Sequence, residues 1–105
     1  MVSEEAVVEY LGQFGDLSER TDKGMRIFER AGRICVCIET GTRPLRLELR
    51  CDRKLSLTLQ ERYESVMESR ALGRNGIELI CSGQLTDEEV LDLVRHAYEM
   101  TTPEE

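Results

Sequence analysis

The side chains that most suggest binding chemistry in this 105-residue sequence are its arginines. Twelve of the fourteen basic residues are arginine, and a planar guanidinium can bind a carboxylate or a phosphate through two parallel hydrogen bonds. Two arginines alternate with leucine in residues 45–50 and should point outward from a strand, and two more follow in an expected loop. The candidate residues for binding nucleic acid or another anion are Arg46, Arg50, Arg70 and Arg74. The alternative is an ordinary solvated sheet face, on which the strand arginines pair with Glu39 or Glu78.

Four cysteines raise the question of a zinc site or of disulfides. They are Cys35, Cys37, Cys51 and Cys81. Cys35 and Cys37 lie on one expected strand, where residues two apart are separated by about 6.7 Å along the backbone. Two sulfurs bound to one zinc ion are at most about 4.6 Å apart, and the sequence contains no C-x-x-C pair. We therefore expect buried or half-buried reduced thiols in a cytoplasmic protein, with no metal or other cofactor.

Combinations of residues typical of catalysis are missing from the sequence. The single histidine, His96, follows Asp92 by four residues on an expected helix, which predicts an exposed ion pair rather than a general base. The nucleophile elbow G-x-S-x-G, a phosphate-binding glycine loop and the zinc-protease motif H-E-x-x-H are absent. Acids at residues 87–89 occupy the start of the last expected helix, which should therefore repel phosphate. We expect a protein that is not an enzyme.

Charge is unevenly distributed along the chain. The formal net charge of -7 divides into -4 for residues 1–23, +3 for residues 24–85 and -6 for residues 86–105. An acidic protein repels DNA at long range, so any DNA binding should be weak, salt-sensitive and confined to the mildly basic middle. The longest apolar run, Ile34–Ile38, is too short to span a membrane, and the acidic start lacks the features of a secretory signal. These observations predict a cytoplasmic protein that does not enter a membrane.

The first half of the sequence predicts one helix followed by strands. Helical spacing of apolar residues covers Ser3–Phe14, with Ser3 as the N-cap and Gly12 or Gly15 as a left-handed residue at the end. The polar residues 16–24 are expected to form a loop. Strands are expected over Met25–Ala31, Ile34–Glu39 and Leu45–Arg50, with turns at Gly32-Arg33 and residues 40–44. In the third strand the leucines should face the core, and Arg46, Glu48 and Arg50 should face solvent.

The second half of the sequence predicts two helices around a strand. Asp52 should cap a helix that runs to about Met67, because apolar residues recur at helical spacing from Leu55 onward. A loop over residues 69–76 and a strand over residues 77–82 should follow. Thr86 and Glu89 have the spacing of a capping box at the start of a helix from Asp87 to about Met100, which Pro103 should end. Residues 1–105 should therefore form a single α+β domain, an antiparallel sheet packed with helices on one face.

From Arg43 onward the sequence resembles the MmcQ/YjbR family of small bacterial proteins. The matching features are the leucine strand, the helix after it, the loop Ser69-Arg70-Ala71-Leu72, the segment Ser82-Gly83-Gln84-Leu85-Thr86-Asp87 and the closing helix with Ala97-Tyr98. The family usually has a Trp where this chain has Asn75-Gly76-Ile77-Glu78, often a Pro at the position of Arg53, and often a Lys at the position of Arg50.

The resemblance implies an α+β fold related in shape to frataxin and to secretion chaperones, and a DNA-binding protein of the double-wing type. Two kinds of function follow for a small noncatalytic binding protein. One is contact with DNA through the arginine-bearing sheet face. The other is a protein-interaction or chaperone-like adaptor that uses its acidic helices or a sheet edge.

Overall fold

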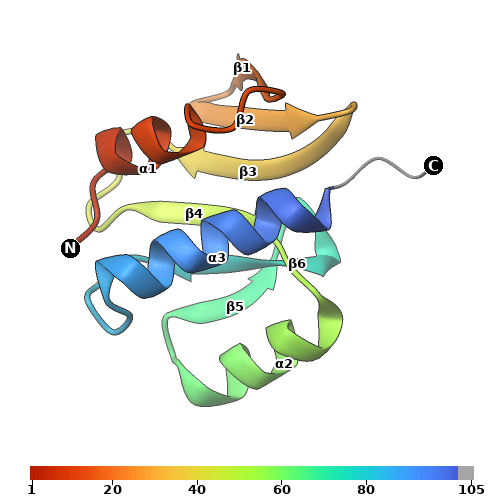
Figure 1. Cartoon of the computed structure of the whole chain (residues 1–105). Helices are drawn as coiled ribbons and strands as arrows, with labels where there is room; N and C mark the ends of the chain where they lie inside the picture. Colours follow the sequence, from red (N-terminus) through yellow and green to blue (C-terminus); the bar gives the residue numbers. More distant parts are fainter. Residues whose placement is uncertain (102–105) are drawn as a thin grey trace.

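The computed structural model, which describes residues 1–101, consists of an antiparallel sheet of six strands and three helices (Figure 1). In chain order the elements are α1 (Glu4–Leu11), β1 (Ser18–Asp22), β2 (Met25–Arg30), β3 (Arg33–Glu39), β4 (Arg46–Arg50), α2 (Arg53–Arg62), β5 (Val66–Ser69), β6 (Gly73–Ile80) and α3 (Asp87–Met100). The strand order is β1-β2-β3-β4-β6-β5. The expected α+β class is thereby confirmed.

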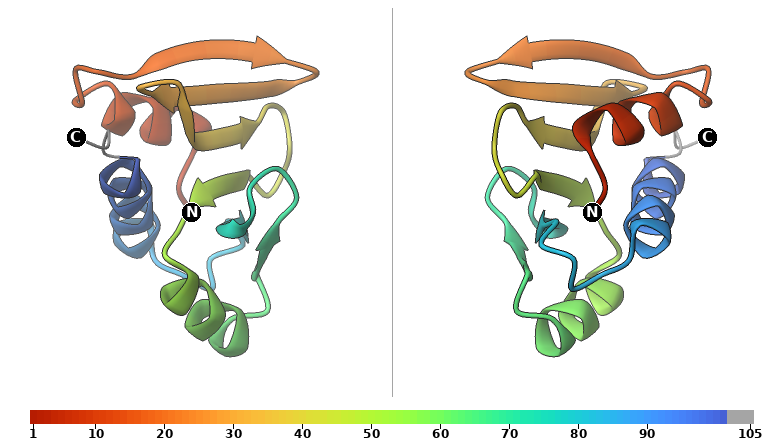
Figure 2. Two further views of the ribbon diagram at one scale, coloured as in Figure 1. Left: turned by 90° about the vertical axis from the view of Figure 1, so that its right-hand side faces the viewer. Right: turned by 90° about the vertical axis from the view of Figure 1, so that its left-hand side faces the viewer.

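The core lies between one face of the sheet and helices α1 and α3. Leu47 is paired with Ile38 on one side and with Leu79 on the other, and all three side chains are fully buried. Val7 and Leu11 of α1 join this cluster, as do the buried residues of α3, Val90, Val94 and Ala97. Figure 2 shows both helices on the same side of the sheet, whereas α2 lies at the β5 and β6 end.

Local capping signals place the helix starts where the sequence predicts them. The Ser3 hydroxyl accepts a hydrogen bond from the Ala6 amide, and Thr86 and Glu89 form a complete reciprocal capping box at α3. These bonds satisfy backbone amides that the helices themselves leave unpaired. The end of α1 differs from the prediction, because Gly12 is its C-cap with a right-handed φ of -63°. The expected end of the last helix at Pro103 lies outside the described residues.

Residues 18–22, expected to be part of a loop, form the edge strand β1. All five residues are exposed, and they pair with β2 from Ser18 opposite Glu29 to Asp22 opposite Met25. Sequence patterns reveal a strand through its buried face. β1 has no buried face and is held by backbone pairing, so the pattern could not reveal it.

The helix after Asp52 ends at Arg62, five residues before the predicted end near Met67. Val66 and Met67 belong to β5, which pairs with β6. The helical spacing of apolar residues continues past the helix to Tyr63 and Val66, but Val66 is buried in a strand of the sheet. β6 starts at Gly73, within the expected loop, and a Cβ on its Gly76 would lie 2.7 Å from the Leu49 carbonyl oxygen. This close strand approach explains why glycine occupies a strand position here.

The β2–β3 hairpin turns one residue earlier than predicted. Ala31 and Gly32 have φ values of 52° and 78°, and Arg30 is paired with Arg33. A two-residue turn in which both residues have a positive φ matches the twist of the flanking strands.

A bulge in the β2–β3 pairing leaves Cys35 without an opposite residue, between the pairs Phe28–Val36 and Glu29–Ile34. Cys35 thereby joins the core cluster, whereas Ile34 is only half-buried.

None of the helices in the described part of the chain is long and apolar enough to cross a membrane.

Candidate functional site

Two of the four candidate arginines converge on one buried carboxylate. The Nε of Arg70 donates to Oε1 of Glu78 at 2.8 Å, and Nη1 of Arg46 lies 3.8 Å from Oε2 of the same residue. The Glu78 side chain is 4% exposed, whereas those of Arg46 and Arg70 are 43% and 70% exposed. The hydrogen bond to Glu78 raises the pKa of Arg70. The pairing of Arg46 with Glu78, expected as the alternative to anion binding, is therefore present.

Glu48, expected to face solvent, is buried beside this pair. It lies opposite Glu78 in the β4–β6 register and is 6% exposed. Its Oε1 accepts from Ser69 Oγ at 2.7 Å and from the Ala71 amide at 2.9 Å. The turn between β5 and β6 therefore closes over the carboxylate. The prediction of an outward Glu48 is wrong because these donors come from a segment more than twenty residues later in the chain.

The other two candidates lie near the opposite end of β4. Arg50 is four residues from Arg46, a separation of about 13 Å along a strand, and its Nε donates to the Ile34 carbonyl oxygen at 2.7 Å. Burial, followed by the nearby charge of Arg33, lowers the pKa of Arg50. Arg74 is exposed and makes no hydrogen bond or ion pair within residues 1–101. Arg46 and Arg50 therefore have different partners at the two ends of β4.

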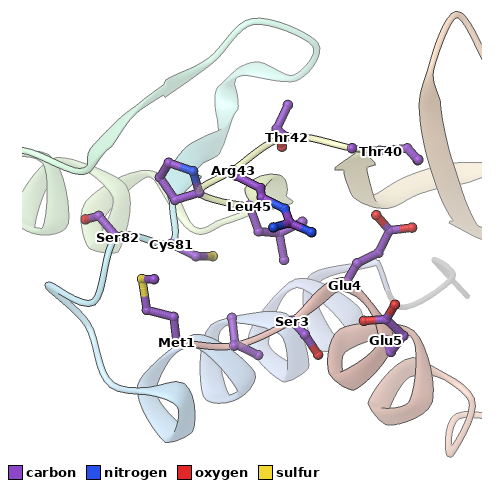
Figure 3. A pocket seen from close by; sticks show the side chains of 13 residues that line it. Met1, Ser3, Glu4, Glu5, Thr40, Thr42, Arg43, Leu45, Cys81 and Ser82 are labelled. Atoms are coloured by element: carbon purple, nitrogen blue, oxygen red, sulfur yellow. The ribbon is translucent and has the colours of Figure 1, made fainter.

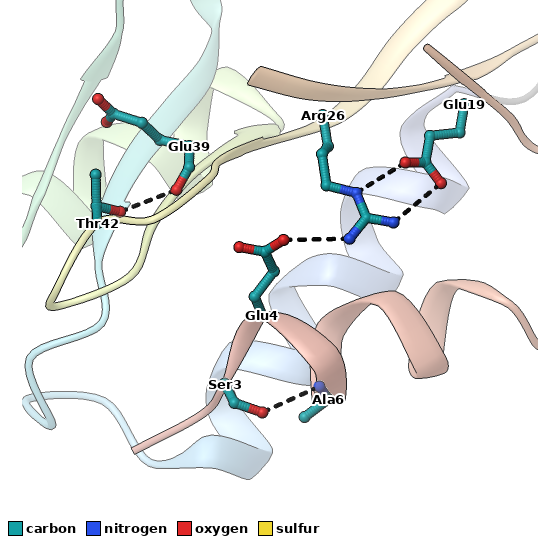
Figure 4. Close-up of polar contacts among 7 residues, drawn as sticks. All are labelled: Ser3, Glu4, Ala6, Glu19, Arg26, Glu39 and Thr42. Carbon is teal, nitrogen blue, oxygen red and sulfur yellow. Dashed lines mark hydrogen bonds and ion pairs between the residues drawn. The ribbon is translucent and has the colours of Figure 1, made fainter. Parts of the chain in front are cut away.

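Most of the other arginines are also paired with carboxylates. Arg26 donates to both carboxylate oxygens of Glu19, at 2.8 and 3.2 Å, and to Glu4 at 3.1 Å, which links β1, β2 and α1 (Figure 4). Further ion pairs join Arg20 to Glu29, Arg30 to Asp16, Arg53 to Glu68 and Arg95 to Glu99. An ion pair within the chain competes with phosphate for the same guanidinium. Five of the eleven basic residues in residues 24–85 thus have a carboxylate partner within the described part of the chain.

All four cysteines are buried and unpaired, as expected for reduced thiols. Burial raises the pKa of Cys37, Cys51 and Cys81 to about 11 in each case, and it also raises the pKa of Cys35. A thiol reacts as its thiolate, so these groups are poor nucleophiles at neutral pH. Within residues 1–101 no group of three or more metal-ligating side chains comes together.

His96 connects α3 to the start of α2. Its Nε2 accepts a hydrogen bond from the Asp52 amide at 3.1 Å, whereas the predicted pair with Asp92 is not formed. The acceptor atom must be unprotonated in this arrangement. The sequence could not reveal the bond that does form, because Asp52 and His96 are 44 residues apart.

Next to His96 an apolar groove of about 280 Å³ runs between α2 and α3, and we call it the α2–α3 groove. Its lining residues are Leu55, Leu59 and Tyr63 of α2, Leu85 of the preceding turn, and Glu89, Asp92, Leu93 and His96 of α3. This groove was not predicted from the sequence. Two features of the sequence could have indicated it: Leu93 is an additional apolar residue beside the core stripe of α3, and Leu55 and Leu59 are four residues apart on α2.

A larger hollow of about 780 Å³ lies between the N-terminal segment and the β3–β4 turn. Figure 3 shows Arg43 and Glu4 at its walls, with Cys81 and Ser82 opposite Met1. Glu4 is already paired with Arg26, and the Cys81 thiol is protonated at neutral pH because burial raises its pKa to about 11. The hollow therefore holds no activated nucleophile.

Comparisons with known proteins identify the fold. Neither the family models nor the curated proteins that were compared match this sequence. A crystal structure of the Deinococcus radiodurans protein DR2400, which has the domain DUF419, is similar with a TM-score of 0.90 and 18% identity, covering 99% of this chain and 81% of that chain. A Pseudomonas syringae protein is similar with a TM-score of 0.76 and 11% identity, covering 95% and 99% of the two chains. At such low identity the similarity shows a shared α+β fold.

Proposed function

We propose that this chain is a noncatalytic binding protein whose partner is another protein rather than nucleic acid. The observation that carries the proposal is the α2–α3 groove, an apolar depression whose walls include half-buried Leu55, Leu59, Tyr63 and Leu93. Apolar side chains that are left half-exposed in a depression can be covered by a partner's side chains, as at the centre of a protein interface. The adaptor function predicted as an alternative is therefore the better supported one.

DNA binding has weaker support. Arg46 and Arg70 would have to leave the buried carboxylate of Glu78 in order to bind phosphate, and a net charge of -7 opposes the approach of DNA. Arg33 and Arg50, which lie close to each other, and the exposed Arg43 and Arg74 are among the cations that could still contact phosphate. The assignment to the MmcQ/YjbR family and the DNA binding that it implies stay predictions.

A noncatalytic role and a cytoplasmic location are parts of the same proposal. The His96 Nε2 is engaged by the Asp52 amide, and the four thiols are held protonated by burial. Four unpaired cysteines are typical of proteins in a reducing compartment.

Site-specific photocrosslinking tests the protein partner. A photoreactive residue at position 59, in the groove, should yield a protein adduct in the native lysate, whereas one at exposed Thr21 of β1 should not. Adducts at both positions or at neither would contradict the proposal.

Anisotropy with a labelled DNA duplex tests the rival function. We expect no binding at low salt. Affinity that falls by decades from low to moderate salt, and that is reduced by Arg74→Glu, would favour DNA instead. Arg74 is the suitable position for charge reversal, because Arg46 is paired with Glu78 and Arg50 is hydrogen-bonded to Ile34.

A further inference from the structure

We infer that the α2–α3 groove binds a basic amphipathic α-helix of a partner protein. This inference rests on the proposed function and adds the partner's secondary structure and charge. It is built from the size of the groove, the backbone of its walls and the charges at its margin.

The size of the groove favours side chains over a small molecule. Sites for small molecules usually measure about 300–1,000 Å³ and enclose most of the ligand. The groove measures about 280 Å³ and is open along α2 and α3. Such a depression fits a few apolar anchor residues of a larger partner, which would cover Leu59 and Leu93.

The walls of the groove favour a helical partner. Both long walls are helices, whose internal backbone amides and carbonyls are bonded within the helix. The Asp52 amide at the start of α2 is hydrogen-bonded to His96 and to no other group within residues 1–101. An extended peptide would thus find few backbone partners here and would leave its own polar groups unpaired. A helix satisfies these groups internally and presents apolar residues at positions i, i+4 and i+7.

The length of α2 is sufficient for a partner helix to bind along it. α2 has ten residues and is therefore about 15 Å long. Anchors at positions i and i+7 of a helix are about 10 Å apart along its axis. Two turns of a partner helix can thus lie against α2.

Charge favours a basic partner. Glu89 and Asp92 are the acidic residues that line the groove. Glu89 is occupied by the capping box, whereas the side chain of Asp92 makes no hydrogen bond or ion pair within residues 1–101. Arg62 of α2 is close enough to Glu89 to lower the pKa of that carboxyl further, after the hydrogen bonds of Thr86. The partner's lysines or arginines should therefore lie near Asp92. A second copy of this acidic chain is disfavoured by the same charges.

A model peptide provides the direct test. The probe is a peptide of about 18 residues, long enough to form a helix, with leucine on one face and lysine on the other. We expect it to bind with a gain of helical circular dichroism and with NMR shift changes at Leu93 and His96. A scrambled peptide of the same composition, and an analogue with glutamate in place of lysine, should not bind.

Three groove variants and one matched control locate the site. Leu59→Asp or Leu93→Asp should abolish binding, whereas Leu57→Asp should not, because Leu57 lies on the same helix outside the groove and is 49% exposed. Asp92→Asn should weaken binding about two- to fivefold and reduce its salt dependence. Thermal unfolding checks that each variant is folded, and if Leu93→Asp unfolds the protein, Leu93→Ala takes its place.

Each contrary outcome has a definite meaning. Equal binding by the scrambled peptide, or equal loss with Leu57→Asp, would overturn the inference. A dimer that Leu93→Asp dissociates, measured by light scattering, would assign the groove to a second copy and would also overturn it. A lysate adduct at position 59 with no peptide binding would overturn the inference and leave the proposed function intact. Peptide binding without any lysate adduct would contradict the proposed function instead.

Discussion

At the scale of single residues, Glu48 and Glu78 are the unusual feature of the structure. They lie opposite each other on neighbouring strands, and only 6% of Glu48 and 3% of Glu78 is exposed to solvent. Glu48 accepts hydrogen bonds from Ser69 at the end of β5 and from the Ala71 amide just after it. Glu78 accepts a hydrogen bond from Arg70 and forms an ion pair with Arg46. Buried carboxylates require such partners, because an unpaired buried charge is costly.

Glu48→Ala should lower the free energy of unfolding by about 1–3 kcal/mol, because it leaves Ser69 Oγ and the Ala71 amide without an acceptor. Urea unfolding measures the change. The control is Glu68→Ala on β5, whose side chain is 48% exposed and pairs with Arg53; it should change stability by less than about 1 kcal/mol. A more stable Glu48→Ala protein would show that repulsion from Glu78 dominates.

Asp16 should make stability depend on pH in the acidic range. Hydrogen bonds from Tyr98, at 2.6 Å, and from Arg30 hold the pKa of Asp16 below its usual value of 3.8. A carboxyl with a lowered pKa in the folded state stabilises the protein above its unfolded pKa, and this contribution is lost as pH falls through the folded pKa. Asp16→Asn should therefore show a smaller loss of stability below about pH 4.

Unfolding experiments between pH 7 and pH 2 would measure this difference. Asp22→Asn is the control, since the side chain of Asp22 is exposed and has no hydrogen bond or ion pair within residues 1–101. The account of Asp16 is wrong if both variants lose the same part of the pH dependence.

At the scale of elements, α3 is the helix whose start is most firmly specified. Its capping box satisfies the amides of Thr86 and Glu89, and its buried face of Val90, Val94 and Ala97 packs on β3 and β4. The same helix provides one wall of the α2–α3 groove through Leu93. Its first turn therefore affects both stability and the proposed binding site.

Thr86→Ala should lower the free energy of unfolding by about 0.5–2 kcal/mol, because the Glu89 amide loses its acceptor. Thr86→Ser keeps the hydroxyl and should be close to the wild type. Chemical denaturation of the three proteins tests this expectation. Equal losses for alanine and serine would point to the threonine methyl group rather than to the cap.

At the scale of the whole molecule, one sheet carries the thiols and the paired arginines, and helices α1 and α3 close its core face (Figure 2). The four cysteines lie on β3, just after β4 and just after β6, and each is at most 5% exposed. No thiol can therefore reach solvent without opening the fold.

Ellman's reagent should consequently react with none of the four thiols in the native protein near neutral pH and with all four in denaturant. Burial and pKa values raised to about 11 for Cys37, Cys51 and Cys81 both slow the native reaction. The rate should rise with urea in parallel with global unfolding. A thiol that reacts fast in the absence of urea would contradict the packing described for it.

Features whose hydrogen bonds and packing are local could be predicted from the amino-acid sequence alone. Ser3 and Thr86 cap helices through bonds that close within three residues, and the alternation of Leu47 and Leu49 marks a strand with one face in the core. The α+β class followed from these elements. Such signals can be read from the sequence because each is complete within a short segment.

Features that depend on partners distant in the chain could be seen only in the tertiary structure. β1 exists because β2 pairs with it, α2 ends at Arg62 because Val66 joins the sheet, and Glu48 is buried because a turn more than twenty residues later donates to it. Arg46 and Arg50 have different partners for the same reason: Glu78 on β6 pairs with Arg46, and the Ile34 carbonyl oxygen on β3 accepts from Arg50. The α2–α3 groove likewise forms only because residues of two helices far apart in the sequence line one depression.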